Sequence, residues 1–330
     1  MIKSAMTGMT QDSASPTVAV IDIGSNSIKV LVAHRTAGGR IHSLDSHALE
    51  VRISAGISGS PPRLGEEGMQ SGVEAVAALV ERSRTFHPGT IQVVATSAVR
   101  DAVNGSDFCA RIKAATGIGV RVLAGEEEAS LIGRGLLTDP TVKDFNDFYL
   151  FDLGGGSLEC LRFHARRVIQ AVSLPLGCVR LTESCVSDRT QPFTAEARAA
   201  VTTQVKTVLK SSAFTFSLGR GADALFIGGT MTTTRFMLAA AAGISSSRAP
   251  TRLPVSDIRS LLDRVAAMRL EDRARLRELP AARADVLPTA LATVLAVAEL
   301  GHITEFHTSF HNLRWGIADE ALPPLQATQR

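Results

Sequence analysis

Two short polar segments of the chain share a pattern of residue types that suits the binding of phosphate groups. Residues 22–27 are Asp-Ile-Gly-Ser-Asn-Ser, and residues 152–157 are Asp-Leu-Gly-Gly-Gly-Ser. In each copy an apolar run ends at the Asp, a turn rich in glycine or hydroxyl side chains follows, and a second apolar run begins. This order predicts a buried strand, a turn and a second strand in each half of the chain.

The residue types of these turns can hold both an anion and a divalent cation. Glycine lets the backbone approach an anion closely and direct its N–H groups toward it. Asp22 and Asp152 are candidate ligands of a cation, directly or through water. The candidate phosphate donors are Ser25, Asn26, Ser27, Gly154, Gly155, Gly156 and Ser157. A single such turn is more typical of a hairpin with an Asx-type turn, whereas two copies at matching strand ends favour a clamp around a phosphate chain.

The composition limits the class of protein. A chain of 330 residues is long enough for two domains of ordinary size, and 45% hydrophobic with 20% charged residues is typical of globular proteins. The formal net charge of +3 is too small to indicate nucleic-acid binding. The most apolar late stretch, residues 286–300, is too short to cross a membrane. We therefore expect neither a nucleic-acid nor a membrane partner.

The cysteines and the first residues bear on the cellular compartment. The four cysteines contain no Cys-x-x-Cys pair, so thiols are favoured over disulfides or a zinc site. Residues 1–16 are small and polar, lack the apolar core of a signal peptide, and are expected to be disordered. These features indicate a cytoplasmic protein.

The second half of the chain is rich in arginine, and two interpretations stay open. The side chains either cover solvated helix faces or form a basic track for a polyanion. The arginines concerned are Arg248, Arg252, Arg259, Arg264, Arg269, Arg273, Arg275, Arg277 and Arg283.

Patterns of strands and helices alternate along both halves. After the first hairpin the sequence predicts strands at 40–50, 91–95 and 120–123 and helices at 69–86, 104–116 and 125–137. Residues 138–147 form a predicted linker, after which the strand–turn–strand pattern returns. A later strand at 225–227 leads into a third glycine turn, with Gly229 and Thr230 as candidate phosphate ligands, and then into a helix from about Thr232. The alternation predicts two α/β domains, 17–137 and 138–312, with a cleft between them.

Several motifs, in this order along the chain, resemble the exopolyphosphatase/guanosine pentaphosphate phosphohydrolase (Ppx/GppA) family of the actin, sugar kinase and Hsp70 superfamily. The resemblance runs from about Val18 to Asp319 and implies two actin-like (ribonuclease H-like) domains with an interdomain cleft. It also implies a C-terminal helix, at about 313–330, that packs back on the first domain, and a homodimer. The segments that carry it are 21–27, 95–102, 125–129, 151–159, 175–183, 227–230 and 283–286.

The resemblance implies an Mg²⁺-dependent hydrolase of terminal phosphoanhydride bonds, acting on inorganic polyphosphate or guanosine pentaphosphate (pppGpp). Glu128, the last Glu of Gly-Glu-Glu-Glu-Ala, is the implied base that activates water, and Glu159 is the other candidate. Asp152 matches the cation-associated carboxylate, and Arg100 matches a cleft arginine that faces the phosphate chain. Lys29 is a further candidate for neutralising phosphate charge. Such a reaction needs an aligned water, a base and compensation of developing charge more than covalent chemistry.

The chain departs from the family pattern in two segments, and other functions stay open. Ala55 occupies the place of a Glu in the usual Arg-φ-Gly-Glu-Gly segment, where φ is an apolar residue, and Trp315 replaces the Glu of Gly-Leu-Arg-Glu-Gly. A non-catalytic sensor of polyphosphate or of an alarmone is one alternative. An ATP-dependent phosphotransferase of the same superfamily is another.

Overall fold

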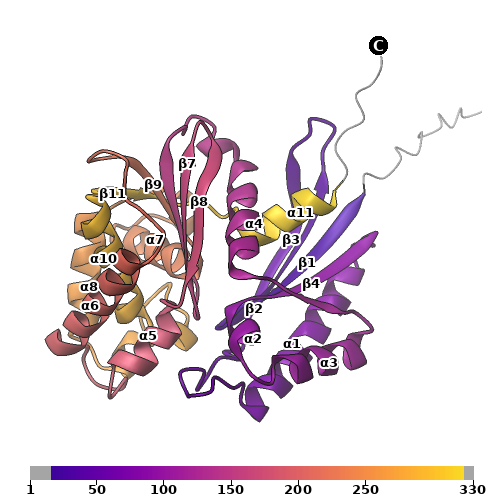
Figure 1. The fold of residues 1–330 in the computed structure, drawn as a ribbon, viewed down its shortest axis with the longest axis horizontal. Helices are drawn as coiled ribbons and strands as arrows, with labels where there is room; N and C mark the ends of the chain where they lie inside the picture. The colour runs from indigo at the N-terminus through magenta and orange to yellow at the C-terminus, as the bar shows by residue number, and fades with distance from the viewer. Residues whose placement is uncertain (1–15, 323–330) are drawn as a thin grey trace, which may run out of the picture.

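The computed structural model describes residues 16–322 as two β-sheets with helices around and between them (Figure 1). The first sheet has the order β3-β2-β1-β4-β5 and the second the order β10-β11-β9-β6-β7-β8. The strands of the first sheet are β1 (Thr17–Ile23), β2 (Ser27–Arg35), β3 (Ile41–Glu50), β4 (Thr90–Ala95) and β5 (Val120–Val122). Those of the second are β6 (Phe148–Leu153), β7 (Leu158–His164), β8 (Arg167–Leu174), β9 (Asp223–Ile227), β10 (Arg252–Pro254) and β11 (Glu305–His307).

The two sheets repeat one topology. In the first, β1, β2 and β3 form an antiparallel meander, and β4 pairs with β1 in parallel. In the second, β6, β7 and β8 form the same meander, and β9 pairs with β6 in parallel. The turns β1–β2 and β6–β7, which contain the two polar segments, therefore occupy equivalent places in their sheets.

Most helices cover the outer faces of the sheets. Beside the first sheet lie α1 (Glu66–Arg84), α2 (Ser97–Asp101) and α3 (Gly105–Thr116), and their apolar side chains share a core with β1, β2 and β4. A larger core joins the second sheet to its helices. These helices are α5 (Cys178–Cys185), α6 (Ala195–Ser211), α7 (Gly229–Ala241), α8 (Val255–Ala266), α9 (Leu270–Arg273) and α10 (Leu287–Gly301). Helix α10 is in contact with its neighbours on most of its sides, so nearly all of its residues are buried.

Two helices lie between the sheets and bring them into one core. Helices α4 (Gly125–Leu137) and α11 (Leu313–Ala321) share a cluster of buried apolar residues with strands of both sheets. They cross closely at two glycines: a Cβ on Gly135 would lie 2.1 Å from the Asn312 carbonyl oxygen, and one on Gly316 would lie 1.9 Å from the Leu131 carbonyl oxygen. Any side chain there would force the helices apart. This crossing fixes the positions of Glu128, near the start of α4, and of Asn312, which precedes α11.

The predicted strands and helices are present, with shifts at some ends. Helix α1 begins at Glu66, before the predicted 69, and α7 begins at Gly229 instead of near 232. The second shift arises because Gly228 adopts φ +97°, a backbone conformation open to glycine, which turns the chain from β9 directly into α7. The predicted disordered segment falls, up to residue 15, outside the described residues, as does the end of the predicted C-terminal helix after 322.

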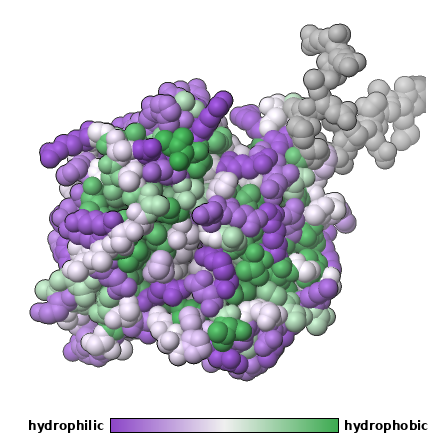
Figure 2. All heavy atoms as spheres, in the orientation of Figure 1, coloured by the Kyte–Doolittle hydropathy of each residue, from purple (hydrophilic) through white to green (hydrophobic). Residues whose placement is uncertain are grey.

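The surface and the cysteines agree with a globular protein. On the face shown in Figure 2, hydrophilic residues are spread among apolar ones. All four cysteines are free thiols, as predicted. Across residues 16–322, no helix combines the length and apolar character that a membrane span requires.

Candidate functional site

The two polar turns have matching backbone geometry and lie against one another. The Gly24 N–H donates to the Ser27 carbonyl over 3.2 Å, and the Gly154 N–H donates to the Ser157 carbonyl over 3.0 Å. A Cβ on Gly155 would lie 2.8 Å from the Ser25 Cβ. The turns therefore meet where the sheets meet, and glycine in the second turn allows the close approach.

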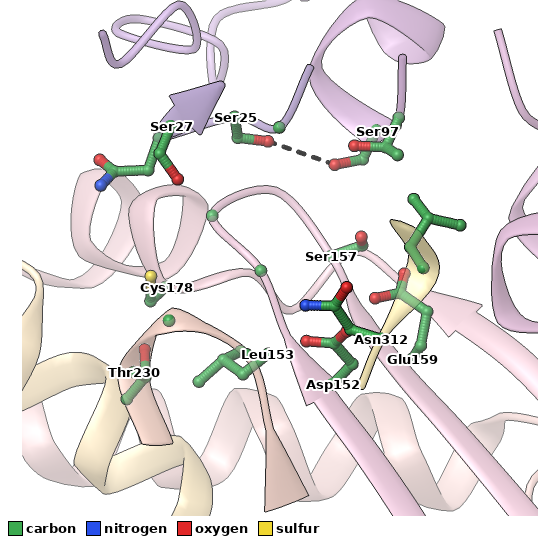
Figure 3. A pocket seen from close by; sticks show the side chains of 18 of the residues that line it. Ser25, Ser27, Ser97, Asp152, Leu153, Ser157, Glu159, Cys178, Thr230 and Asn312 are labelled. Carbon is green, nitrogen blue, oxygen red and sulfur yellow. Dashed lines mark hydrogen bonds between the residues drawn. The ribbon is translucent and has the colours of Figure 1, made fainter. Parts of the chain in front are cut away.

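A cavity opens beside the two turns, with about 90 Å³ accessible to the centre of a water molecule. We call it the inner cavity. Figure 3 shows Ser25 and Ser97 on one side of it and Asp152, Glu159 and Asn312 on another. The predicted residues that line it are Asp22, Ser25, Asn26, Ser27, Lys29, Glu128, Asp152, Gly154, Gly155, Ser157, Glu159, Gly229 and Thr230.

Two predicted residues, Gly156 and Arg100, are not part of this lining. A Cβ on Gly156 would lie 2.3 Å from the Ser97 hydroxyl oxygen, so this glycine serves the contact between the turns. The Arg100 guanidinium donates to Glu128 Oε2 over 2.8 Å and to the Leu123 carbonyl over 2.9 Å. Arg100 thus contacts the predicted base, Glu128. The family resemblance implied instead that Arg100 faces the phosphate chain.

Equivalent register positions carry different residues in the two hairpins. Asp22 lies opposite Lys29 in the β1–β2 pair, and Asp152 lies opposite Glu159 in the β6–β7 pair. Burial raises the pKa of Asp22, and it raises the pKa of Asp152 to about 6. The positive charges of Lys29 and of buried Arg314 oppose both shifts.

Two further carboxyl groups complete the acidic side of the cavity. Burial raises the pKa of Glu159 to about 7, and the nearby charge of Asp152 adds to the shift. Burial and the charge of Glu159 raise the pKa of Glu128, while the hydrogen bond from Arg100 opposes the rise. Glu159 Oε1 also accepts a hydrogen bond of 2.7 Å from the Ser173 hydroxyl. Carboxyl groups with pKa values near neutral pH, grouped in a cavity, suit proton transfer.

The donor set fits a divalent cation held partly by substrate. Among residues 16–322, Asp22 Oδ1 is buried with no hydrogen-bond partner, so it is available to a cation. Within residues 16–322 no group of three or more His, Cys, Asp or Glu side chains is arranged to hold a metal ion. Mg²⁺ is often bound by only one or two carboxylates together with water and substrate phosphates. Asp22 and Asp152 match that pattern.

Residues that were not among the predicted site residues also line the cavity, including Arg283 of the arginine-rich second half. Arg283 lies so close to the start of α7 that a Cβ on Gly229 would be 2.0 Å from its Nη1. The sequence did contain a signal for Arg283, because segment 283–286 is one of those that carry the family resemblance. Arg273, by contrast, is buried and donates to the Arg189 carbonyl, so it cannot belong to a surface track. Other lining residues without an earlier role are Thr96, Ser97, Cys178, Thr233 and Asn312.

Comparisons with known proteins agree with this architecture. A family model described as the Ppx/GppA phosphatase family matches residues 31–324. An exopolyphosphatase from Cytophaga hutchinsonii ATCC 33406 is 22% identical, with a TM-score of 0.82 over 91% of this chain and 96% of that one. The Aquifex aeolicus PPX-GPPA enzyme is 23% identical, with a TM-score of 0.74 over 92% of this chain and 99% of that one. An exopolyphosphatase-like protein is 26% identical, with a TM-score of 0.80 over 93% and 97%. The predicted α/β fold, with the strand–turn–strand pattern repeated in two sheets of the same topology, is confirmed.

Proposed function

We propose that this chain, which belongs to the Ppx/GppA phosphatase family, releases the terminal phosphate of inorganic polyphosphate. Family membership makes it a phosphoanhydride hydrolase, and the proposal concerns its substrate and the roles of its residues. One observation carries the proposal: the two phosphate-type turns and the buried carboxyl groups of Glu128 and Glu159 line the same small cavity.

The basic side of the cavity binds the substrate. Backbone N–H groups of the two turns and the hydroxyls of Ser25 and Ser157 are donors for the terminal phosphate oxygens. Lys29 supplies positive charge, and its unusual environment supports that role, because burial lowers its pKa and a bound phosphate would restore the charged form. The remaining phosphates extend toward Arg283.

The acidic side activates water. Glu128 accepts a proton from the attacking water, and Arg100 holds the Glu128 carboxylate in place and keeps its pKa from rising further. Glu159, whose carboxylate is hydrogen-bonded to Ser173, aligns the water. Asp22 and Asp152 would hold Mg²⁺, which when bound offsets negative charge on the phosphates.

A second candidate substrate is pppGpp, and one feature favours it. A wider cavity of about 600 Å³ adjoins the inner one and is lined by Phe236 and Phe310. We call it the outer cavity. Its two aromatic rings, 6.2 Å apart between centroids, offer a surface on which a nucleobase could stack.

The test is an initial-rate assay of phosphate release from tripolyphosphate, long-chain polyphosphate and pppGpp, each with Mg²⁺ and with EDTA. We expect release from polyphosphate that EDTA abolishes. Phosphate release from pppGpp alone would show that pppGpp, and not polyphosphate, is the substrate. No release from any of the three, by protein that binds polyphosphate, would favour the non-catalytic sensor.

A further inference from the structure

A carboxylate of the chain itself occupies two donors of the phosphate site. Glu50, the last residue of β3, accepts hydrogen bonds at Oε1 from Arg283 Nε over 3.1 Å and from Arg283 Nη2 over 2.9 Å. Its Oε2 accepts one from the Asn26 amide over 2.9 Å. Arg283 and Asn26 both line the inner cavity. Two groups suited to phosphate oxygens are therefore already engaged by an internal anion.

These contacts lie at the passage between the inner and outer cavities. Arg283 lines both, its Nη2 lies 3.3 Å from the Ser27 hydroxyl, and its guanidinium covers Gly229 at the start of α7. Glu50 lines the outer cavity. The cavities share the lining residues Lys29, Gly228, Gly229, Thr233, Arg283 and Asn312. A polyanion with its end in the inner cavity would have to pass beside Glu50.

A neighbouring ion pair joins the same two segments of chain but lies outside this passage. Arg52 binds Asp285 through Nη1 over 2.5 Å and Nη2 over 2.8 Å, and also donates to the Ala282 carbonyl. Neither Arg52 nor Asp285 lines the inner or the outer cavity. The two pairs are charged in opposite senses. The first half of the chain supplies the anion, Glu50, in one pair and the cation, Arg52, in the other. The pair of Glu50 with Arg283 therefore lines the cavities, whereas Arg52 contacts their lining through the hydrogen bond of its Nε to Asn26 Oδ1, over 2.9 Å.

We propose that Glu50 competes with polyphosphate for Arg283 and Asn26 and so lowers the affinity of the site for its substrate. It holds both groups in the free protein and releases them to phosphate oxygens when a polyanion enters. The guanidinium fork binds carboxylate and phosphate with the same paired geometry, so the exchange preserves its hydrogen bonds. The displaced carboxylate stays near the bound chain and repels it, which lowers the affinity. This inference rests on the proposed binding of polyphosphate in the cavity.

The test measures binding by calorimetry, with tripolyphosphate and Mg²⁺, in protein carrying Glu128→Gln to prevent turnover. We expect Glu50→Gln to lower the Kd about fivefold, which corresponds to about 1 kcal/mol. Glu50→Ser is a second variant for the same effect, should Gln disturb folding. Asp285→Asn is the matched control, because it removes the same charge from the neighbouring pair, and it should not tighten binding.

A double-mutant cycle separates competition from a general effect of charge. In protein that also carries Arg283→Ala, the gain in affinity from Glu50→Gln should be smaller, because only the contact with Asn26 and the repulsion by the carboxylate are then removed. Unchanged or weaker binding in both Glu50 variants would overturn the inference, as would equal tightening by Asp285→Asn or a gain of the same size in protein that lacks Arg283. Tighter binding in Glu50→Gln without phosphate release by the wild-type protein would overturn the proposed hydrolysis and leave the competition standing.

Discussion

The two hairpins that form the site share a backbone but differ in charge. In each, an Asp near the end of the first strand lies opposite a residue of the second strand, and the turn between them closes with the same hydrogen bond. The opposite residue is Lys29 in the first hairpin and Glu159 in the second. One scaffold thus carries a cation on one side of the cavity and a titratable acid on the other.

This difference suggests a division of labour. Burial disfavours the charged form of both groups, so it lowers the pKa of Lys29 and raises that of Glu159 to about 7. A cation with a lowered pKa gains from an incoming phosphate, whereas a carboxyl group with a raised pKa can exchange protons with water. The first hairpin would then govern substrate binding, and the second, with Glu128 of α4 beside it, would govern the chemical step.

The largest expected effect comes from removing the base on the acidic side. Glu128→Gln should lower kcat by about 10²–10⁴-fold, the typical contribution of a general base, because Gln keeps the shape but cannot accept the proton. The affinity for tripolyphosphate should stay within a few-fold. Phosphate release and calorimetry measure the two quantities. Glu126→Gln, at an exposed position of the same helix turn, is the control, and equal activity of both variants would place the base elsewhere.

The basic side should respond in KM. Lys29→Met should raise KM for polyphosphate about tenfold or more, because a charged hydrogen-bond donor to phosphate is lost, with a smaller change in kcat. Lys206→Met, which removes a surface lysine paired with Glu299, should leave KM unchanged. If Lys29→Met lowered kcat and left KM unchanged, the first hairpin would not be the one that governs substrate binding.

The sequence predicts only some of the residues of the two hairpins and of the site around them, and the reason is physical. Asp22, Asp152 and the glycines were predictable because each belongs to a short segment whose local order fixes a strand end and a turn. Contacts between distant segments were not predictable. Glu50 and Arg283 are 233 residues apart, and only the meeting of the sheets brings them together.

Arg100 shows the same limit at shorter range. Its sequence motif indicated an arginine near the cleft, but the motif could not choose between phosphate and carboxylate as its partner. In the structure the partner is a carboxylate, because α4 places Glu128 Oε2 2.8 Å from the Arg100 guanidinium. The division of the chain at about residue 137 stays a prediction, since α4 and α11 share one core with both sheets.

The pH profile sharpens the comparison further. With Glu159 at about pKa 7, kcat/KM should rise as pH rises toward and through 7 and this carboxyl group ionises. Arg100→Ala should move this limb to higher pH, because Arg100 lowers the pKa of Glu159 through its charge and that of Glu128 through its hydrogen bond. Arg121→Ala, which removes an arginine paired with the neighbouring Glu127, is the control. A higher KM with an unmoved limb would instead make Arg100 a phosphate ligand.

The smallest expected effect concerns stability. The pKa of Glu159 is raised in the folded protein, to about 7 from an ordinary 4.5, so ionised Glu159 destabilises the folded state above pH 7. As pH falls through 7, the folded protein takes up a proton that the unfolded chain does not, and this contribution to stability is recovered.

Glu159→Gln should therefore raise the free energy of unfolding at pH 8 by about 2 kcal/mol while lowering activity. At pH 5 its gain should be much smaller, because wild-type Glu159 is then protonated in the folded protein and most of the penalty is gone. Urea denaturation at both pH values measures the difference, with exposed Glu126→Gln as the control. An equal gain at both pH values would show that the effect comes from packing or hydrogen bonding. The buried charge of Glu159 would then not be what distinguishes the second hairpin from the first.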